Sequence, residues 1–138
     1  MKILKFIMLA LMLGMPFSHA EAKHVKVPHM YMFGFSASFN DSTLYLTDIQ
    51  DVANAWYDTK TKFLMGRDSY SYQLKEYFEA QGQPGRVCLV MYATTKKKAE
   101  KLYRKLKKKY ADKSGHISGL QYLTSSDFKF NAVDVAEE

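Results

Sequence analysis

Strict alternation of side-chain character over residues 30–39 constrains the fold more than any other feature of the chain. A period of two over this length predicts a half-buried β-strand with its aromatic face in the core. The same face could instead line a groove for sugar rings or an apolar ligand. Turn-forming residues at 40–42 and an apolar segment at 43–47 predict the return strand of a β-hairpin. The residues of the aromatic face are Tyr31, Phe33, Phe35, Ala37 and Phe39.

Gly34 interrupts this strand without a side chain. A glycine within a strand predicts a bulge or the close approach of another chain segment. After the hairpin, apolar residues change to helical spacing over residues 49–57, behind Thr47 or Asp48 as a potential N-cap. This spacing predicts a short helix.

A second helix is predicted to begin at Asp68 or Ser69, either of which can cap it, and to end at Gly82. The segment 86–93 that follows is apolar almost throughout. A strand with two apolar faces is typical of the centre of a sheet, so we predict a central strand there.

A third and longer helix is predicted over residues 96–109, capped by Thr94 or Thr95, with one apolar stripe facing inward. Segments 119–123 and 127–133 then predict two late strands, the second from the alternation of its apolar residues.

Together these segments predict an α+β two-layer sandwich. The sheet is expected to have about four or five strands, to be mixed or mainly antiparallel, and to begin with the N-terminal β-hairpin. Two or three helices are expected to cover one face. The recurring strand–helix–strand order resembles a ferredoxin-like arrangement, which by itself carries no function.

Residues 1–20 have the three parts of a secretory signal peptide. Positive charges at Lys2 and Lys5 precede an apolar run over residues 6–17, and small residues end at Ala20. The run is shorter than the roughly 20 residues that cross a bilayer. We therefore predict cleavage after Ala20, with an uncleaved anchor as the alternative, and export to the periplasm or out of the cell.

The remaining chain is expected to comprise a flexible lead-in at 21–28, a single domain at 29–134 and a frayed tail at 135–138. No segment after the signal peptide is long and apolar enough to predict a transmembrane helix.

Cys88 is the single cysteine, so no internal disulfide forms, and its apolar surroundings in the sequence predict a buried, unreactive thiol. The remaining histidines, His24, His29 and His116, have no metal-ligand spacing. We find no catalytic motif. The sequence therefore predicts no metal site, no cofactor and no enzymatic activity.

The predicted helix at 96–109 is strongly basic: nine of its residues are Lys or Arg, and Glu100 is its single acid. Exposed amides and hydroxyls at a helix N-terminus also suit an anion. Two interpretations stay open, a solubilising surface and a binding surface for a polyanion. The candidate anion-binding residues are Thr94, Thr95, Lys96, Lys97, Lys98, Lys101, Arg104 and Lys105.

The candidate partners of this helix are lipid headgroup phosphates, an acidic polysaccharide and an acidic protein. Nucleic acid is disfavoured, because Tyr103 and Tyr110 lie on the inward stripe rather than among the charges, where bases could stack on them. A weaker candidate site for a carboxylate or phosphate is the junction that contains Arg67 and Tyr72.

Four motifs carry a resemblance. They are YMFGFSASFNDS at 31–42, YLTDIQ at 45–50, GR at 66–67 and YSYQL at 70–74. In these motifs the chain resembles small exported proteins of unknown function from Bacteroidetes-type bacteria. The resemblance implies an exported single-domain protein, and it implies no activity, ligand or site.

We therefore expect an exported, non-enzymatic binding or structural protein of the cell envelope, with an anionic partner on the basic helix. Two alternatives stay open. One is an envelope hydrolase whose site is not visible in the sequence. The other is an assembly subunit that pairs with another chain through the free edge of the hairpin at 30–47.

Overall fold

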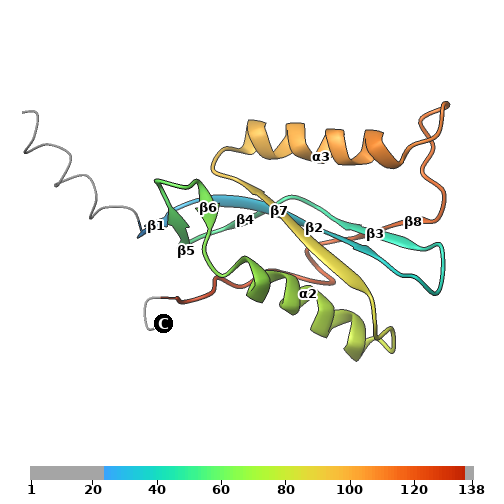
Figure 1. The fold of residues 1–138 in the computed structure, drawn as a ribbon, viewed down its shortest axis with the longest axis horizontal. Helices are drawn as coiled ribbons and strands as arrows, with labels where there is room; N and C mark the ends of the chain where they lie inside the picture. The colour runs from blue at the N-terminus through green and yellow to red at the C-terminus, as the bar shows by residue number, and fades with distance from the viewer. Residues whose placement is uncertain (1–23, 136–138) are drawn as a thin grey trace, which may run out of the picture.

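The structure, a computed structural model, describes residues 24–135 as two β-sheets and two α-helices (Figure 1). One sheet has three strands and the other has five, which confirms the α+β class. The predicted signal peptide lies outside the described residues, as do residues 21–23 and 136–138. The elements are β1 His24–Val27, β2 Met30–Ala37, β3 Leu44–Thr47, β4 Gln50–Val52, β5 Ala55–Asp58, β6 Phe63–Leu64, α2 Arg67–Ala80, β7 Val87–Ala93, α3 Lys96–Tyr110 and β8 Leu120–Leu123.

Strand β2 is the centre of the five-stranded sheet. It pairs antiparallel with β7 on one side and with both β4 and β3 on the other. The β2–β3 pair confirms the predicted hairpin, and the parallel β3–β8 pair makes the sheet mixed. The predicted central strand β7 is instead at the edge of the sheet among the described residues. Both hairpin strands have neighbours on both sides, so the hairpin offers no free edge to another chain among the described residues.

The two helices cover opposite faces of this sheet (Figure 1). Phe33 of β2 contacts Tyr103 of α3, with ring centroids 5.1 Å apart, whereas the neighbouring Gly34 lies against Leu74 of α2. Successive residues of a strand point to opposite faces, so the two helices cannot share one face. The predicted two-layer sandwich with helices on one face is therefore wrong, and the arrangement is not plainly ferredoxin-like. The prediction of a half-buried β2 is wrong for the same reason.

Gly34 marks both a close approach and a bulge, as the sequence predicted. A Cβ atom there would lie 2.6 Å from Cδ2 of Leu74, and the Gly34 N–H donates to Oγ1 of Thr47 at 2.8 Å. Met32 pairs with Gln50, and Phe35 pairs with Leu46. Two residues of β2, one of them Gly34, therefore lie opposite three residues of the facing chain, which is a bulge. The extra residue separates β3 from β4.

The predicted helix at 49–57 is wrong, because this segment forms strands β4 and β5. Asn54 adopts a left-handed conformation, with φ of 64°, that a continuous helix does not allow. On either side of Asn54 the chain continues the ladder, β4 against β2 and β5 against β1. Residues 24–27 of the expected flexible lead-in are accordingly strand β1. Pairing with a distant strand overrides the local helical spacing.

The predicted strand at 127–133 is also wrong, although its alternating Phe128 and Phe130 are buried. Within residues 24–135 the segment forms no ladder with a strand, and side-chain amides satisfy part of its backbone instead. Gln50 donates to the Phe128 carbonyl and accepts from the Phe130 N–H, at 2.9 and 2.8 Å. Gln73 of α2 makes the equivalent pair with Asn131, at 2.8 and 2.9 Å. The alternation of apolar residues in this segment therefore indicates which side chains are buried and does not indicate that the segment pairs as a strand.

The helix ends follow the sequence only in part. Thr95 caps α3 by accepting from the Lys98 N–H at 3.3 Å, as predicted. Helix α2 begins after Gly66, whose φ is 71°, and it has no side-chain cap, so neither Asp68 nor Ser69 is its cap. Its C-terminus is followed by Gly82 in the left-handed region, which confirms the predicted end.

Candidate anion-binding surface

Helix α3 is attached to the sheet by its aromatic and aliphatic stripe. Tyr103 packs edge-on against Phe33, and Tyr110 stacks on Phe35 with centroids 4.9 Å apart. Of the α3 residues, Ala99 alone is fully buried among the described side chains. The apolar stripe is used by the sheet, which leaves the polar side of the helix in solvent.

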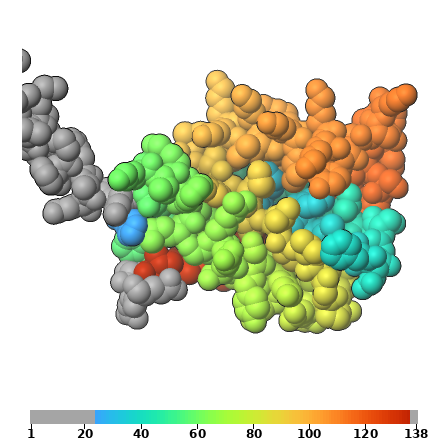
Figure 2. Space-filling model, in the orientation of Figure 1, coloured from blue at the N-terminus to red at the C-terminus, as the bar shows by residue number. Residues whose placement is uncertain are grey.

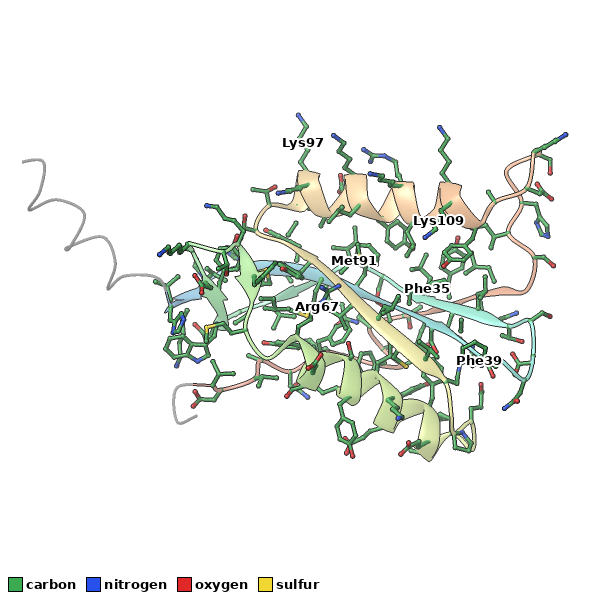
Figure 3. The ribbon with its side chains drawn as sticks, viewed as in Figure 1. Phe35, Phe39, Arg67, Met91, Lys97 and Lys109 are labelled. Atoms are coloured by element: carbon green, nitrogen blue, oxygen red, sulfur yellow. The ribbon has the colours of Figure 1, made fainter. Side chains whose placement is uncertain are left out.

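The basic residues of α3 project from this outer side. In Figure 3 the side chain of Lys97 points away from the sheet. A shallow depression of about 530 Å³ along the helix brings together most of the predicted anion-binding residues, which recur at helical spacing. It is lined by Thr95, Lys97, Lys98, Lys101, Leu102, Arg104 and Lys105.

Two predicted residues lie outside this depression, Thr94 and Lys96, although both are exposed. The structure also gives less support to a discrete anion site at the helix N-terminus, because the Lys98 amide already donates to the Thr95 hydroxyl. The arrangement is therefore an extended basic surface rather than a pocket for one small anion.

The charge of this surface is not neutralised within the part of the chain that the structure describes. The ion pairs there involve His24, His29 and Arg86, and none involves an α3 lysine or arginine. Burial, with smaller contributions from Tyr122 and Asp48, raises the pKa of Tyr103 to about 12. Tyr103 therefore stays neutral at physiological pH and does not offset the lysines.

Lys107 differs from the other α3 lysines. Its Nζ lies 5.7 Å from the ring centroid of Tyr103 and 5.2 Å from that of Tyr122. This half-buried position over two aromatic rings gives the ammonium a favourable cation–π environment. Lys107 thus packs against the rings, whereas the candidate residues face outward.

The secondary candidates do not form one site. The Arg67 guanidinium donates to the Val90 carbonyl, through Nε at 3.0 Å and Nη2 at 2.7 Å, and lies over the ring of Tyr92. Tyr72 is exposed, and the nearby Glu76 raises the pKa of its phenol. Arg67 is therefore directed at strand β7 while Tyr72 faces solvent.

Cys88 is less buried than its apolar neighbours in the sequence predicted. The side chain is half-buried, its Sγ lies 3.6 Å from the Ser36 hydroxyl, and burial raises the pKa of the thiol. A raised pKa leaves little thiolate at neutral pH.

The described residues contain no group of three or more His, Cys, Asp or Glu side chains placed to hold a metal ion. Within the same part of the chain, no helix has the length and apolar character needed to cross a membrane. The comparisons with known proteins found no matching family model, no matching curated protein and no matching solved structure.

Proposed function

We propose that the protein is an exported, non-enzymatic binding protein whose α3 surface engages an anionic component of the cell envelope. The observation that carries this proposal is the row of exposed α3 bases with no carboxylate partner in residues 24–135. Unpaired charge of one sign along a helix attracts a partner with repeated opposite charges.

The shape of the surface favours an extended partner over a small ion. The bases of helix α3 run from Lys96 to Lys109, so they extend along about 20 Å of helix axis. A membrane surface or an acidic polymer can meet several of them at once. Insertion of α3 into lipid is disfavoured, because its apolar stripe packs on Phe33 and Phe35.

Nucleic acid remains the least favoured polyanion. The aromatic rings of Tyr103 and Tyr110 are stacked on the sheet, so neither offers an open platform for a base. Duplex DNA is nevertheless a useful probe, since it presents dense negative charge without lipid or sugar chemistry.

The test compares the chain with two triple variants at two salt concentrations. One variant reverses charge on the surface (Lys97/Lys101/Arg104→Glu), and the other reverses as much charge elsewhere, at three exposed lysines (Lys60/Lys113/Lys129→Glu). Each protein is titrated against anionic lipid vesicles, heparin and duplex DNA.

We expect the tightest probe to lose at least about tenfold in affinity with the α3 variant and less than about twofold with the control. Binding should also weaken as salt rises. Equal losses in the two variants would mean that net charge, and not the α3 surface, drives binding. Feeble binding to all probes would leave the lysines as a solubilising surface.

A further inference from the structure

Strand β7 is an open edge of the five-stranded sheet. Among the described residues it pairs with β2 and with no second strand. Figure 2 shows β7, in yellow, accessible between α3 in orange and α2 in green. Open strand edges accept a strand from another chain unless the protein blocks them.

The backbone groups on this edge can be assigned from the ladder. Gly34 of β2 donates its N–H to Thr47, on the side away from β7. Its partner Val90 therefore directs N–H and C=O away from β2, and Cys88, two residues earlier, does the same. Within residues 24–135, the N–H groups of Cys88 and Val90 have no backbone or side-chain acceptor.

Arg67 blocks part of the edge. Its guanidinium occupies the Val90 carbonyl with two hydrogen bonds, at 3.0 and 2.7 Å. In the first half of β7 the groups that remain open are the Cys88 N–H and C=O and the Val90 N–H, whereas Tyr92, which has the same orientation, lies beyond the Arg67 guanidinium. An added strand would therefore pair with the first half of β7.

Hollows lie on both sides of this half-strand. On the α2 side, a groove of about 380 Å³ is bordered by Val87, Cys88 and the polar residues Ser71, Tyr72 and Lys75. On the α3 side, a cavity of about 170 Å³ is apolar and includes Phe35, Phe39, Val87, Leu89 and Tyr110. Phe39 is 93% exposed there. An added strand would direct alternate side chains into a polar hollow and an apolar one.

The charges around the edge are mostly positive. Arg67 and Lys75 border it on the α2 side, and Lys109 lies over the ring of Tyr110 on the α3 side, 5.7 Å from its centroid. The acids on the α2 side are Asp68, which lines the groove, and Glu76, which interacts with the bordering Tyr72. A second copy would bring its own basic α3 beside this edge, and that repulsion disfavours self-pairing. Carboxylates on a partner strand would be attracted instead.

We propose that the open half of β7 binds an extended segment of another protein in which apolar and acidic residues alternate. The segment adds a strand to the sheet by bonding to Cys88 and Val90. Its apolar side chains cover Leu89 and Phe39, and its acidic side chains lie near Lys75. This surface is distinct from the outer side of α3 and does not depend on the function proposed for it.

Amide hydrogen exchange of the full chain tests the proposal, with a blocked octapeptide of alternating Val and Glu as the probe. We expect saturating peptide to slow exchange of the Cys88 and Val90 amides at least about tenfold. The amides of Leu89 and Met91, which already face β2, should not change. A Val and Lys octapeptide is the matched control and should give no protection.

A charge reversal at the exposed Lys75 sharpens the test without disturbing the core. Lys75→Glu should weaken binding of the Val and Glu peptide about fivefold, whereas Lys60→Glu, remote from this groove, should not. Unchanged exchange of Cys88 and Val90 at saturating peptide would overturn the proposal.

Two results without peptide would also overturn it. Protection of Cys88 and Val90 that grows with protein concentration, together with a doubled sedimentation mass, would make a second copy the occupant. Protection at every concentration would mean that the chain itself already covers the edge.

Discussion

The two faces of the five-stranded sheet differ in how firmly they are covered. On the α2 face, the side chains of Tyr70, Leu74 and Phe78 are each at most 1% exposed. The C-terminal segment packs on the same face and is held there by hydrogen bonds from Gln50 and Gln73. On the α3 face the strands contribute the buried Phe33, Phe35 and Leu46, and apart from the buried Ala99 the helix adds partly exposed side chains.

We expect the α2 face to determine the stability of the fold and the α3 face to determine the binding of partners. The α2 face holds the main core, so changes there should unfold the protein. The α3 helix leaves more of its surface in water and carries most of the unpaired positive charge. Changes on its outer side should therefore alter partners more than folding.

The largest effect is expected from truncating the core leucine of each helix. Leu74→Ala should lower the free energy of unfolding by about 3 kcal/mol, because Leu74 is 1% exposed and packs against Gly34. Leu102→Ala, at a partly exposed position of α3, should cost about 1 kcal/mol. Urea denaturation measures both, and equal losses would contradict the comparison.

A smaller effect is expected from the side-chain amides that hold the C-terminal segment. Gln50→Ala should cost about 2 kcal/mol, since it leaves the buried Phe128 carbonyl and Phe130 N–H without partners. Gln73→Ala, whose bonds are exposed, should cost less than about 1 kcal/mol because water replaces them. Urea midpoints in the reverse order would contradict this ranking of the two amides.

The Thr95 cap of α3 should contribute less to the free energy of unfolding than Gln50 does. Thr95→Ala should lower the free energy of unfolding by about 1 kcal/mol, and Thr95→Ser should restore most of it. Polyanion affinity measured on the same variants separates two roles for Thr95. An unchanged affinity is expected for a cap, whereas a large loss would identify Thr95 as a ligand.

The smallest effect is a pH dependence in the loop after α3. The Asp112 carboxylate accepts from the Ser114 hydroxyl and amide and from the His116 amide, which lowers its pKa. A lowered folded-state pKa gives stabilisation that is complete above the unfolded value, about 3.9, and is lost as pH falls through the folded value. Asp112→Asn should therefore flatten the acid side of the stability profile. Parallel profiles for the two proteins would contradict this assignment.

Several elements could be predicted from local patterns. Helix α3 was placed correctly because its apolar stripe and its Thr95 cap are both encoded within a few residues. The hairpin of β2 and β3 follows from alternation and a turn. The end of α2 at Gly82 was also predicted correctly, although its N-terminus uses Gly66.

The errors share one physical origin, which is that side-chain period does not identify backbone partners. Residues 49–57 fit a helical period, but β2 and β1 supply hydrogen bonds that only strands can take. Residues 127–133 fit a strand period, but glutamine side chains make the hydrogen bonds to their backbone that a neighbouring strand would make. The apolar run of β7 suggested a central position, whereas its outer neighbour is missing among the described residues.

The candidate surface was likewise predicted only where it depends on local sequence. The sequence places the bases of α3 on one helix and predicts their outward direction, because polarity and period suffice for that. It could not show that Arg67 lies on the Val90 carbonyl, or which of Thr94 and Thr95 caps the helix.

The sequence by itself determined the hairpin, the two helices and the basic character of α3, since each depends on neighbours within a few residues. Tertiary structure alone decided that the helices take opposite faces, that residues 49–58 cross from one sheet to the other, and that β7 is an open edge. Those outcomes depend on which distant backbone satisfies each N–H and C=O, and local periodicity does not carry that information.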